Sequence, residues 1–148
     1  MQRVLFVCTG NTCRSPMAEA ILKHKAPTYD VQSAGIFAGY GQSANDHAIQ
    51  ALDRKGISCN HSSQPVTREL LNWSDLILTM TEQHKRTLKA DFPGIDDKIF
   101  TLKEYALDSR DDLDVHDPIG LSVETYEQTL KEIEMYIDLM LEKQEGDL

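Results

Sequence analysis

The sequence of 148 residues lacks the long apolar run of a membrane span and the basic excess of a nucleic-acid-binding protein. No stretch approaches the roughly 20 consecutive apolar residues that cross a bilayer. Lys and Arg number 15 against 24 Asp and Glu, and the resulting net charge of −9 disfavours nucleic acids and anionic membranes as partners. Cysteines number only three, which excludes a disulfide-stapled mini-protein. With 41% hydrophobic and 26% charged residues, the composition indicates one globular domain over residues 1–148.

The first residues carry no pattern of a secretory signal. A short apolar run at residues 4–7 follows Met1 almost directly, without the longer hydrophobic region and cleavage site of a signal peptide. We therefore expect a reducing, cytoplasmic environment, in which Cys8, Cys13 and Cys59 are free thiols used for chemistry or packing.

Apolar segments and turn signals alternate along the chain in a pattern that predicts alternating strands and helices. The expected strands are residues 2–8, 29–34, 75–80 and 98–102. The first expected helix has Ser15 as its cap and Pro16 as its first residue. Three more are expected at residues 44–52, 67–73 and 81–90. Ser122 is expected to cap the last helix, which continues to residue 140. This alternation implies a parallel sheet with helices on both faces, in which ligands bind at the carboxyl ends of the strands.

The loop after the first strand has the residues of a nucleophilic site. Cys8 ends the strand, five residues separate it from Arg14, and a helix follows at once. The N–H groups of such a loop and of the helix N-terminus can converge on one anion, and Arg14 can pair two oxygens of a phosphate-like dianion. In that field the Cys8 thiol should be ionised near pH 7, with Ser15 close enough to donate to the sulfur. A packed cysteine and a solvated arginine would give the same bare spacing, but the strand, Gly10 and the Ser-Pro helix start favour a phosphatase.

Residues 7–19, VCTGNTCRSPMAE, resemble the signature of the low-molecular-weight protein tyrosine phosphatases. The likeness continues with Ser33-Ala34-Gly35 after the second strand, with DLILTM at residues 75–80 and with Asp117-Pro118. The resemblance implies an α/β fold: a single-domain three-layer sandwich whose four-stranded parallel sheet has the order 2-1-3-4. It also implies that the protein needs no metal and no organic cofactor.

The resemblance further implies a role for each residue of the site. Cys8 would be the nucleophile, Arg14 would bind the phosphoryl group, and Asp117 would be the general acid. Ser15 would assist the thiolate, and Asn11 would hold the loop in a strained shape. Ser33 and His61 would be among the supports of the loop. The phosphate-binding loop would consist of Thr9, Gly10, Asn11, Thr12, Cys13, Arg14 and Ser15.

The general acid can also be sought from the residues alone. Five aspartates lie in the acidic loop of residues 108–120. Nearby negative charges raise the pKa of a carboxyl group, so one of the five can stay protonated near neutrality. Asp117 stands out because Pro118 restricts the backbone around it. Without the resemblance, the choice among the five stays open: Asp108, Asp111, Asp112, Asp114 and Asp117.

Two positions depart from the tyrosine-specific members of this family. Thr12 stands where those members usually carry an aliphatic residue, and Ile119-Gly120 follows Asp117-Pro118 where they often carry tyrosines that wall the cleft. Thr12 resembles the branch that dephosphorylates phosphoarginine on proteins, since a hydroxyl can contact a polar substrate. We therefore expect a protein-arginine phosphatase that works through a phosphocysteine intermediate, with a protein tyrosine phosphatase as the alternative.

Two further alternatives fit the residues less well. Arsenate reduction needs a resolving pair of cysteines downstream, and after Cys13 the chain has only Cys59. A phosphate-binding module without turnover would need neither a nucleophile nor Asp117. The expected partners are phosphorylated proteins, with inorganic phosphate as product and weak inhibitor, and the protein is expected to be a monomer that binds neither nucleic acid nor membranes.

Cys13 and four of the histidines are not assigned a catalytic role. A reversible Cys8–Cys13 disulfide that protects the thiolate from overoxidation is one hypothesis for Cys13, and plain packing of a small side chain is the other. Four histidines have no metal-like spacing and are expected at the surface: His24, His47, His84 and His116.

Overall fold

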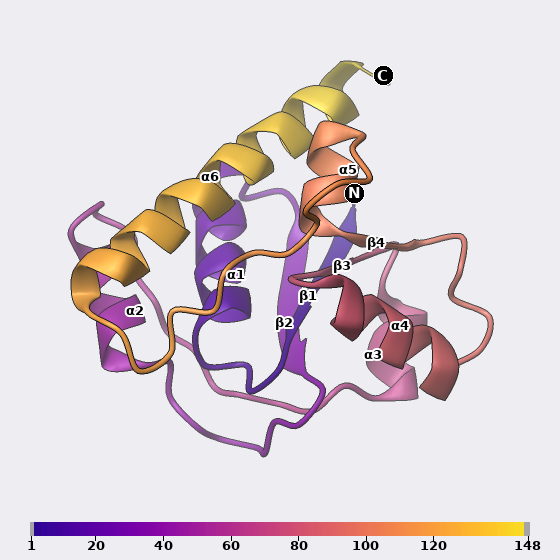
Figure 1. The fold of residues 1–148 in the computed structure, drawn as a ribbon, viewed down its shortest axis with the longest axis horizontal. Coiled ribbons are helices and arrows are strands. Elements are labelled where there is room, and N and C mark those ends of the chain that lie inside the picture. The colour runs from indigo at the N-terminus through magenta and orange to yellow at the C-terminus, as the bar shows by residue number, and fades with distance from the viewer. Residues whose placement is uncertain (1, 147–148) are drawn as a thin grey trace.

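A four-stranded parallel sheet in the order β2-β1-β3-β4 forms the centre of the computed structural model, which describes residues 2–146 (Figure 1). The strands are β1 (Arg3–Cys8), β2 (Asp30–Gly35), β3 (Leu76–Thr79) and β4 (Ile99–Thr101). β1 lies between β2 and β3, and all of its residues from Val4 to Cys8 are buried. The predicted sheet and its order are thus confirmed, and Cys8 lies at the carboxyl end of a central strand.

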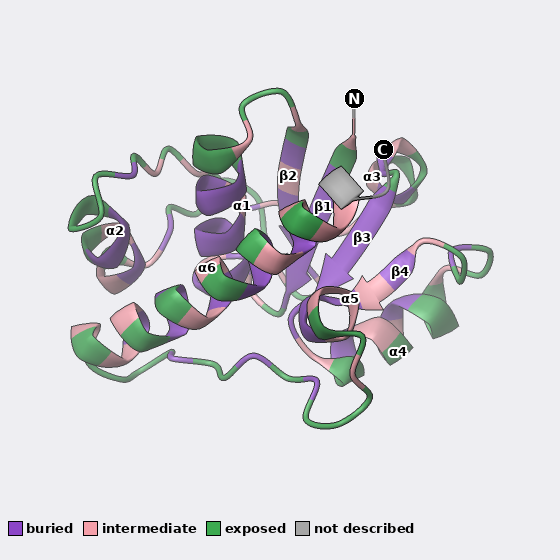
Figure 2. Ribbon diagram, turned by 90° about the horizontal axis from the view of Figure 1, so that it is seen from above, coloured by how far each residue is buried: buried purple, intermediate pink, exposed green. Residues whose placement is uncertain are grey.

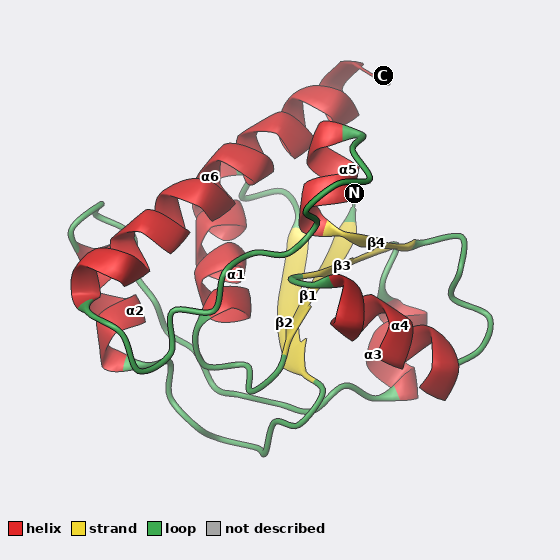
Figure 3. Cartoon of the chain, viewed as in Figure 1, coloured by secondary structure: helices red, strands yellow, loops and turns green. Residues whose placement is uncertain are grey.

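Helices cover both faces of this sheet (Figure 3). They are α1 (Arg14–Lys25), α2 (Asp46–Asp53), α3 (Arg68–Trp73), α4 (Glu82–Asp91), α5 (Leu102–Leu107) and α6 (Val123–Gly146). Alternate residues of β1 point to opposite faces, so Val4 and Phe6 pack in the core under α1, α2, α5 and α6, whereas Leu5 and Val7 pack under α3 and α4. The three-layer sandwich is therefore the one that the alternating pattern predicts.

The helix α6 is the longest element and is amphipathic. Its inner face buries seven residues at helical spacing. Its opposite face is exposed to solvent (Figure 2). The buried residues are Tyr126, Thr129, Leu130, Ile133, Tyr136, Ile137 and Met140. As predicted, the side chain of Ser122 accepts a hydrogen bond of 3.3 Å from the Thr125 amide ahead of the first turn. Within residues 2–146 no helix is long and apolar enough to cross a membrane.

Two local predictions are wrong. The helix α1 begins at Arg14 after Cys13, so Ser15 is not its cap; the Ser15 hydroxyl is instead bonded inside the site, and Pro16 is tolerated because the first turn needs no intrahelical donor. The strand expected at residues 98–102 ends at Thr101, where Thr101 and Glu104 form a capping box that starts α5, a helix the apolar pattern did not reveal.

Candidate active site

The loop that joins β1 to α1 presents a series of unpaired backbone donors. The carbonyl oxygens of Cys8, Thr9 and Thr12 accept bonds of 3.0, 2.9 and 2.8 Å from backbone N–H groups of the segment after β2. Among the described residues, by contrast, the N–H groups of residues 9–13 donate to no other protein group. Buried backbone donors are nearly always satisfied in folded proteins, and Asn11 and Cys13 of this loop are buried, so five successive unpaired N–H groups beside a helix N-terminus indicate a site for an anion.

The Cys8 thiol lies at this loop with a defined partner. Its sulfur is 2.9 Å from the Ser15 Oγ, and both residues are buried. The Asn11 Nδ2 donates to the same Ser15 oxygen at 2.8 Å, so the hydroxyl proton of Ser15 is left to point at the sulfur. Ser15 can therefore stabilise a thiolate at Cys8, as expected from the sequence.

Asn11 holds the loop from within. Its φ of 57° is in the left-handed region, and the residue is fully buried. Its Nδ2 also donates to the Ser33 Oγ at 2.9 Å, and its Oδ1 accepts from the Gln64 amide at 3.0 Å. Asparagine is among the few residues that adopt this conformation at modest cost, and the three side-chain bonds fix it there.

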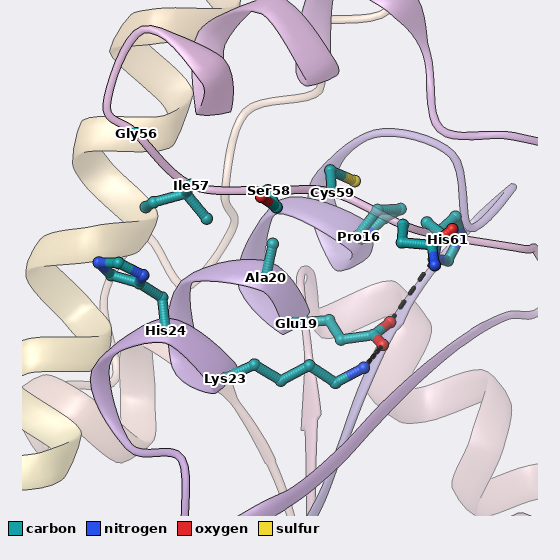
Figure 4. A pocket seen from close by; sticks show the side chains of 11 residues that line it. Pro16, Glu19, Ala20, Lys23, His24, Gly56, Ile57, Ser58, Cys59 and His61 are labelled. Atoms are coloured by element: carbon teal, nitrogen blue, oxygen red, sulfur yellow. Dashed lines mark hydrogen bonds and ion pairs between the residues drawn. The ribbon is translucent and has the colours of Figure 1, made fainter.

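A second layer of polar groups supports Asn11 from the side of α1. The His61 Nε2 donates to the Asn11 carbonyl oxygen at 2.7 Å, and the Ser33 Oγ donates to Glu19 at 2.5 Å. Figure 4 shows Glu19 also joined to His61 and to Lys23, at the wall of a cavity of about 280 Å³ between α1 and residues 56–61. Burial raises the pKa of Glu19, but hydrogen bonds from His61, Lys23 and Ser33 outweigh it, so that the pKa is lowered overall.

Arg14 and Asp117 meet at the mouth of the loop. The guanidinium is buried, with 5% of the side chain exposed, and its Nη1 donates to the Val115 carbonyl oxygen at 3.0 Å. Its Nη2 lies 3.5 Å from the Asp117 Oδ2, and the Asp117 side chain is 43% exposed. The Asp117 Oδ1 accepts from the Ile119 amide at 3.1 Å, which fixes the carboxylate against its own turn. The structure thus places one aspartate of the acidic loop beside the arginine.

The other four aspartates of that loop lie elsewhere. Asp114 accepts a hydrogen bond of 2.9 Å from the Glu82 amide at the start of α4. Asp108 and Asp112 pair with Lys143 and Lys103 at 2.8 and 3.7 Å, and Asp111 is exposed. Asp117 is thus the aspartate of this loop whose carboxylate lies beside Arg14, and its role as general acid stays a prediction that this contact favours.

The thiols other than Cys8 have different surroundings. The Cys13 sulfur lies 3.3 Å from the hydroxyl of the fully buried Tyr126, and burial raises the pKa of the Cys13 thiol. Thr12, half-buried, brings its Oγ1 to 3.9 Å from the same sulfur. Cys59 is half-buried in the wall of the cavity beside Glu19. All three thiols are free, so the Cys8–Cys13 disulfide stays a hypothesis.

Two polar neighbours of the loop, Glu19 and His84, were not predicted from the sequence. Glu19 is part of the quoted motif, but its contacts with Ser33 and His61 depend on the packing of three segments. His84 was expected at the surface and that prediction is wrong: it is 7% exposed, and its Nε2 lies 2.9 Å from the Thr9 Oγ1. A histidine in the first turn after a buried strand was the available signal, because that turn lies at the carboxyl edge of the sheet.

Comparison with known proteins agrees with this geometry. A model of the family "Low molecular weight phosphotyrosine protein phosphatase" matches residues 3–146. The chain is 49% identical over 135 residues to the protein-arginine-phosphatase of Bacillus subtilis, covering 88% of this chain and 89% of the relative. It is 38% identical over 131 residues to the low molecular weight protein-tyrosine-phosphatase PtpB of Staphylococcus aureus, covering 88% and 91%.

A solved structure has the same fold. The YwlE arginine phosphatase from Geobacillus stearothermophilus superposes with a TM-score of 0.95 at 42% identity, covering 99% of this chain and 95% of the other. The loop, its sulfur and the fold together lead to one assignment: the chain belongs to the low molecular weight phosphotyrosine protein phosphatase family and is a protein phosphatase.

Proposed function

We propose that this protein is a protein-arginine phosphatase that forms a phosphocysteine at Cys8. The observation that carries the catalytic part is the run of unpaired N–H groups at residues 9–13, which directly follows a sulfur that is hydrogen-bonded to Ser15. Those donors are suited to bind the equatorial oxygens of the phosphoryl group during its transfer. The guanidinium of the buried Arg14 can donate two further, charged hydrogen bonds to these oxygens. The loop from Thr9 to Ser15 thus binds the phosphoryl group, and Ser33 and His61 support it through Asn11.

The reaction proceeds in two displacements. The Cys8 thiolate attacks phosphorus, the bond from phosphorus to the guanidinium nitrogen breaks, and Asp117 gives a proton to the departing nitrogen. A water molecule then attacks the phosphocysteine, Asp117 takes a proton from that water, and the bond from phosphorus to sulfur breaks. Inorganic phosphate leaves, and the thiolate is restored with Ser15 as its donor. Phosphate, as the product, acts as a weak competitive inhibitor.

Thr12 supports phosphoarginine as the substrate. Its hydroxyl is half-buried in the loop, where an isoleucine would present only carbon atoms. The carboxylate of Asp117 at the mouth is suited to a guanidinium as well as to proton transfer. The greater identity to a protein-arginine-phosphatase, 49% against 38% to a protein-tyrosine-phosphatase, points the same way.

One observation favours phosphotyrosine as the second candidate. The Phe37 amide donates to the Thr9 carbonyl oxygen at 2.9 Å, and 82% of Phe37 is exposed. The backbone of Phe37 thus lies beside the phosphate-binding loop, and its exposed ring is available to stack on a phenyl ring. Phe37 would then take the role of the tyrosines that the tyrosine-specific members often carry at the positions of Ile119 and Gly120.

Steady-state kinetics on matched peptides decide between the two substrates. We expect a higher kcat/KM for a phosphoarginine peptide than for the phosphotyrosine peptide of the same flanking sequence. Thr12→Ile should reverse or erase this preference, whereas Thr12→Ser, which keeps the hydroxyl, should retain it. A preference for phosphotyrosine that Thr12→Ile leaves unchanged would reject the arginine assignment. Acid quenching with radiolabelled substrate should trap label on the native protein and none on Cys8→Ala.

A further inference from the structure

A buried imidazole beside the phosphate-binding loop has no part in the mechanism above. His84 lies in the first turn of α4, where its amide donates to the Thr81 side chain at 3.1 Å. The turn follows β3, which pairs with β1 in the sheet, so it begins at the same edge of the sheet at which β1 ends (Figure 1). Its Nε2 reaches the Thr9 Oγ1 at 2.9 Å, and Thr9 is the residue that follows the nucleophile.

The other ring nitrogen of His84 decides where the proton lies. Among the side chains that the structure describes, those of residues 2–144, Nδ1 of His84 is the single buried nitrogen or oxygen without a hydrogen-bond partner. A proton on Nδ1 would leave a buried donor unsatisfied, whereas a proton on Nε2 is donated to Thr9 and leaves only a lone pair unpaired. The geometry therefore favours the tautomer in which the Nε2–H donates to the Thr9 hydroxyl oxygen.

The surroundings keep this imidazole neutral. Burial lowers the pKa of His84 to about 4, and the positive charge of Arg14 acts in the same direction. Asp114 and Asp117, the acidic groups that face it, oppose this effect but are weaker. A neutral ring carries one N–H, so the arrangement with Thr9 persists at neutral pH.

The orientation of the Thr9 hydroxyl follows from this tautomer. Its oxygen accepts from His84, so its own hydrogen must point to another acceptor. Thr9 is exposed, and it begins the run of residues 9–13 whose backbone N–H groups donate to no other protein group. We propose that the Thr9 side chain donates a hydrogen bond to a phosphoryl oxygen of the substrate and that His84 is the positioning residue that aims it. This inference rests on the proposed function only in that the loop must bind a phosphoryl group; it holds for either phosphoamino acid.

A double-mutant cycle with p-nitrophenyl phosphate tests the pair. Thr9→Val and His84→Leu should each lower kcat/KM about tenfold, and the double variant should lose no more than the worse single variant, because both changes remove one interaction. Thr9→Ser and His84→Gln keep a hydroxyl and an N–H donor and should recover much of the loss. His24→Leu, at an exposed histidine of α1, is the control and should behave as the native protein. Losses that multiply in the double variant would overturn the proposal.

Inhibition by inorganic phosphate separates positioning from general damage. Thr9→Val and His84→Leu should raise the inhibition constant of phosphate by similar factors while the thermal midpoint stays close to that of Thr9→Ser and His84→Gln. Unchanged phosphate affinity in both variants would overturn the proposed hydrogen bond. Native protein that turns over p-nitrophenyl phosphate but not phosphoarginine peptides would reject the arginine assignment and leave this test of Thr9 and His84 intact.

Discussion

Asn11 has a left-handed backbone conformation, and its side chain also positions polar groups of the site. Its left-handed conformation turns the loop around Cys8, and its amide group orients Ser15 and Ser33 at the same time. The side chain therefore does two separable things: it accepts the conformation at modest cost, and it satisfies buried polar partners. Each has its own energetic scale, since a left-handed residue with a Cβ costs about 1–2 kcal/mol and a broken buried hydrogen bond about 1–3 kcal/mol.

Substitution of Asn11 by alanine and by glycine separates these two contributions. Asn11→Ala should lower the free energy of unfolding by more than Asn11→Gly, by about 1 kcal/mol, because glycine adopts a φ of 57° without the Cβ penalty. Both variants should lose most of their activity, since neither side chain reaches Ser15 or Ser33. Urea unfolding and turnover of p-nitrophenyl phosphate measure the two effects. Equal stability of the two variants would show that the left-handed conformation carries no cost here.

The residues of the site differ in how far the sequence reveals them. Cys8 and Arg14 were predictable because five residues between them, a strand before and a helix after define a local geometry. His84 was not, because its contact with Thr9 spans 75 positions and its burial depends on where α4 packs. Asp117 lies between these cases: its local sequence suggested it, but only the contact of the acidic loop with Arg14 distinguishes it from four neighbouring aspartates.

At the scale of elements, the end of β2 shapes the phosphate-binding loop. A Cβ on Gly35 would lie 2.6 Å from the Thr9 carbonyl oxygen and 2.9 Å from the Asn11 amide nitrogen, distances that real Cβ atoms do not show. These are backbone atoms of the loop, so they cannot turn aside as a side chain would. The glycine that ends the predicted second strand is thus required by the approach of the loop, and not by a turn of its own backbone.

Gly35→Ala should therefore displace the backbone of the phosphate-binding loop, although Gly35 lies outside that loop. We expect a loss of about 1–3 kcal/mol in the free energy of unfolding, in the range of overpacked sites, together with a marked loss of kcat. Gly39→Ala is a matched control, because nothing lies within 4 Å of a Cβ at that position, and it should change stability by less than about 0.5 kcal/mol. Denaturant unfolding and kinetics on both variants provide the comparison. Native activity in Gly35→Ala would mean that the loop can shift without consequence.

The acidic loop is held to the sheet by backbone and side-chain contacts close to Asp117. The Val115 amide donates to the Met80 carbonyl oxygen at 2.8 Å, and the Lys103 Nζ donates to the Asp114 carbonyl oxygen at 3.3 Å. Lys103 is buried in the first turn of α5, and its Nζ lies 3.5 Å from Glu132 of α6. The helix that the apolar pattern failed to reveal therefore supplies an anchor for the segment that carries Asp117.

Lys103→Met should loosen this segment. We expect kcat to fall about tenfold, less than for Asp117→Asn, because the carboxyl is present but less well placed. Lys103→Arg, which retains a donor and the charge, should recover part of the rate. Lys131→Met, at an exposed lysine of α6, should have no effect. A kcat for Lys103→Met equal to that of the native protein would show that the backbone contact of Val115 suffices.

For the whole molecule, the net charge of −9 contrasts with the anion that the site must bind. The loop resolves this conflict locally, because its donors are backbone N–H groups, the N-terminus of α1 and one buried arginine. Charges farther than the Debye length, about 10 Å at 0.1 M salt, are largely screened from it. The acidic surface should thus bias the protein towards basic surroundings of the phosphorylated residue without weakening the phosphate site itself.

The stability of the whole fold should depend on pH through Glu19. Burial raises the pKa of this carboxyl, but the donors His61, Lys23 and Ser33 bring it below its ordinary value of 4.5. Because the pKa is lower in the folded than in the unfolded chain, ionised Glu19 stabilises the fold at every pH above 4.5, and this contribution is lost as the pH falls through the folded value.

Glu19→Gln should therefore be less stable than the native protein by about 1.5–3 kcal/mol at neutral pH, the range for hydrogen bonds to a charged group. The difference should shrink as the pH falls below 4.5, where the native carboxyl also becomes neutral. Urea unfolding at a series of pH values measures this difference in the free energy of unfolding. Glu142→Gln, at an exposed position of α6, is the control. A difference that stays constant over this series would mean that Glu19 acts through its shape and not through its charge. A difference that shrinks would link the carboxylate at the base of the site to the acid stability of the whole chain.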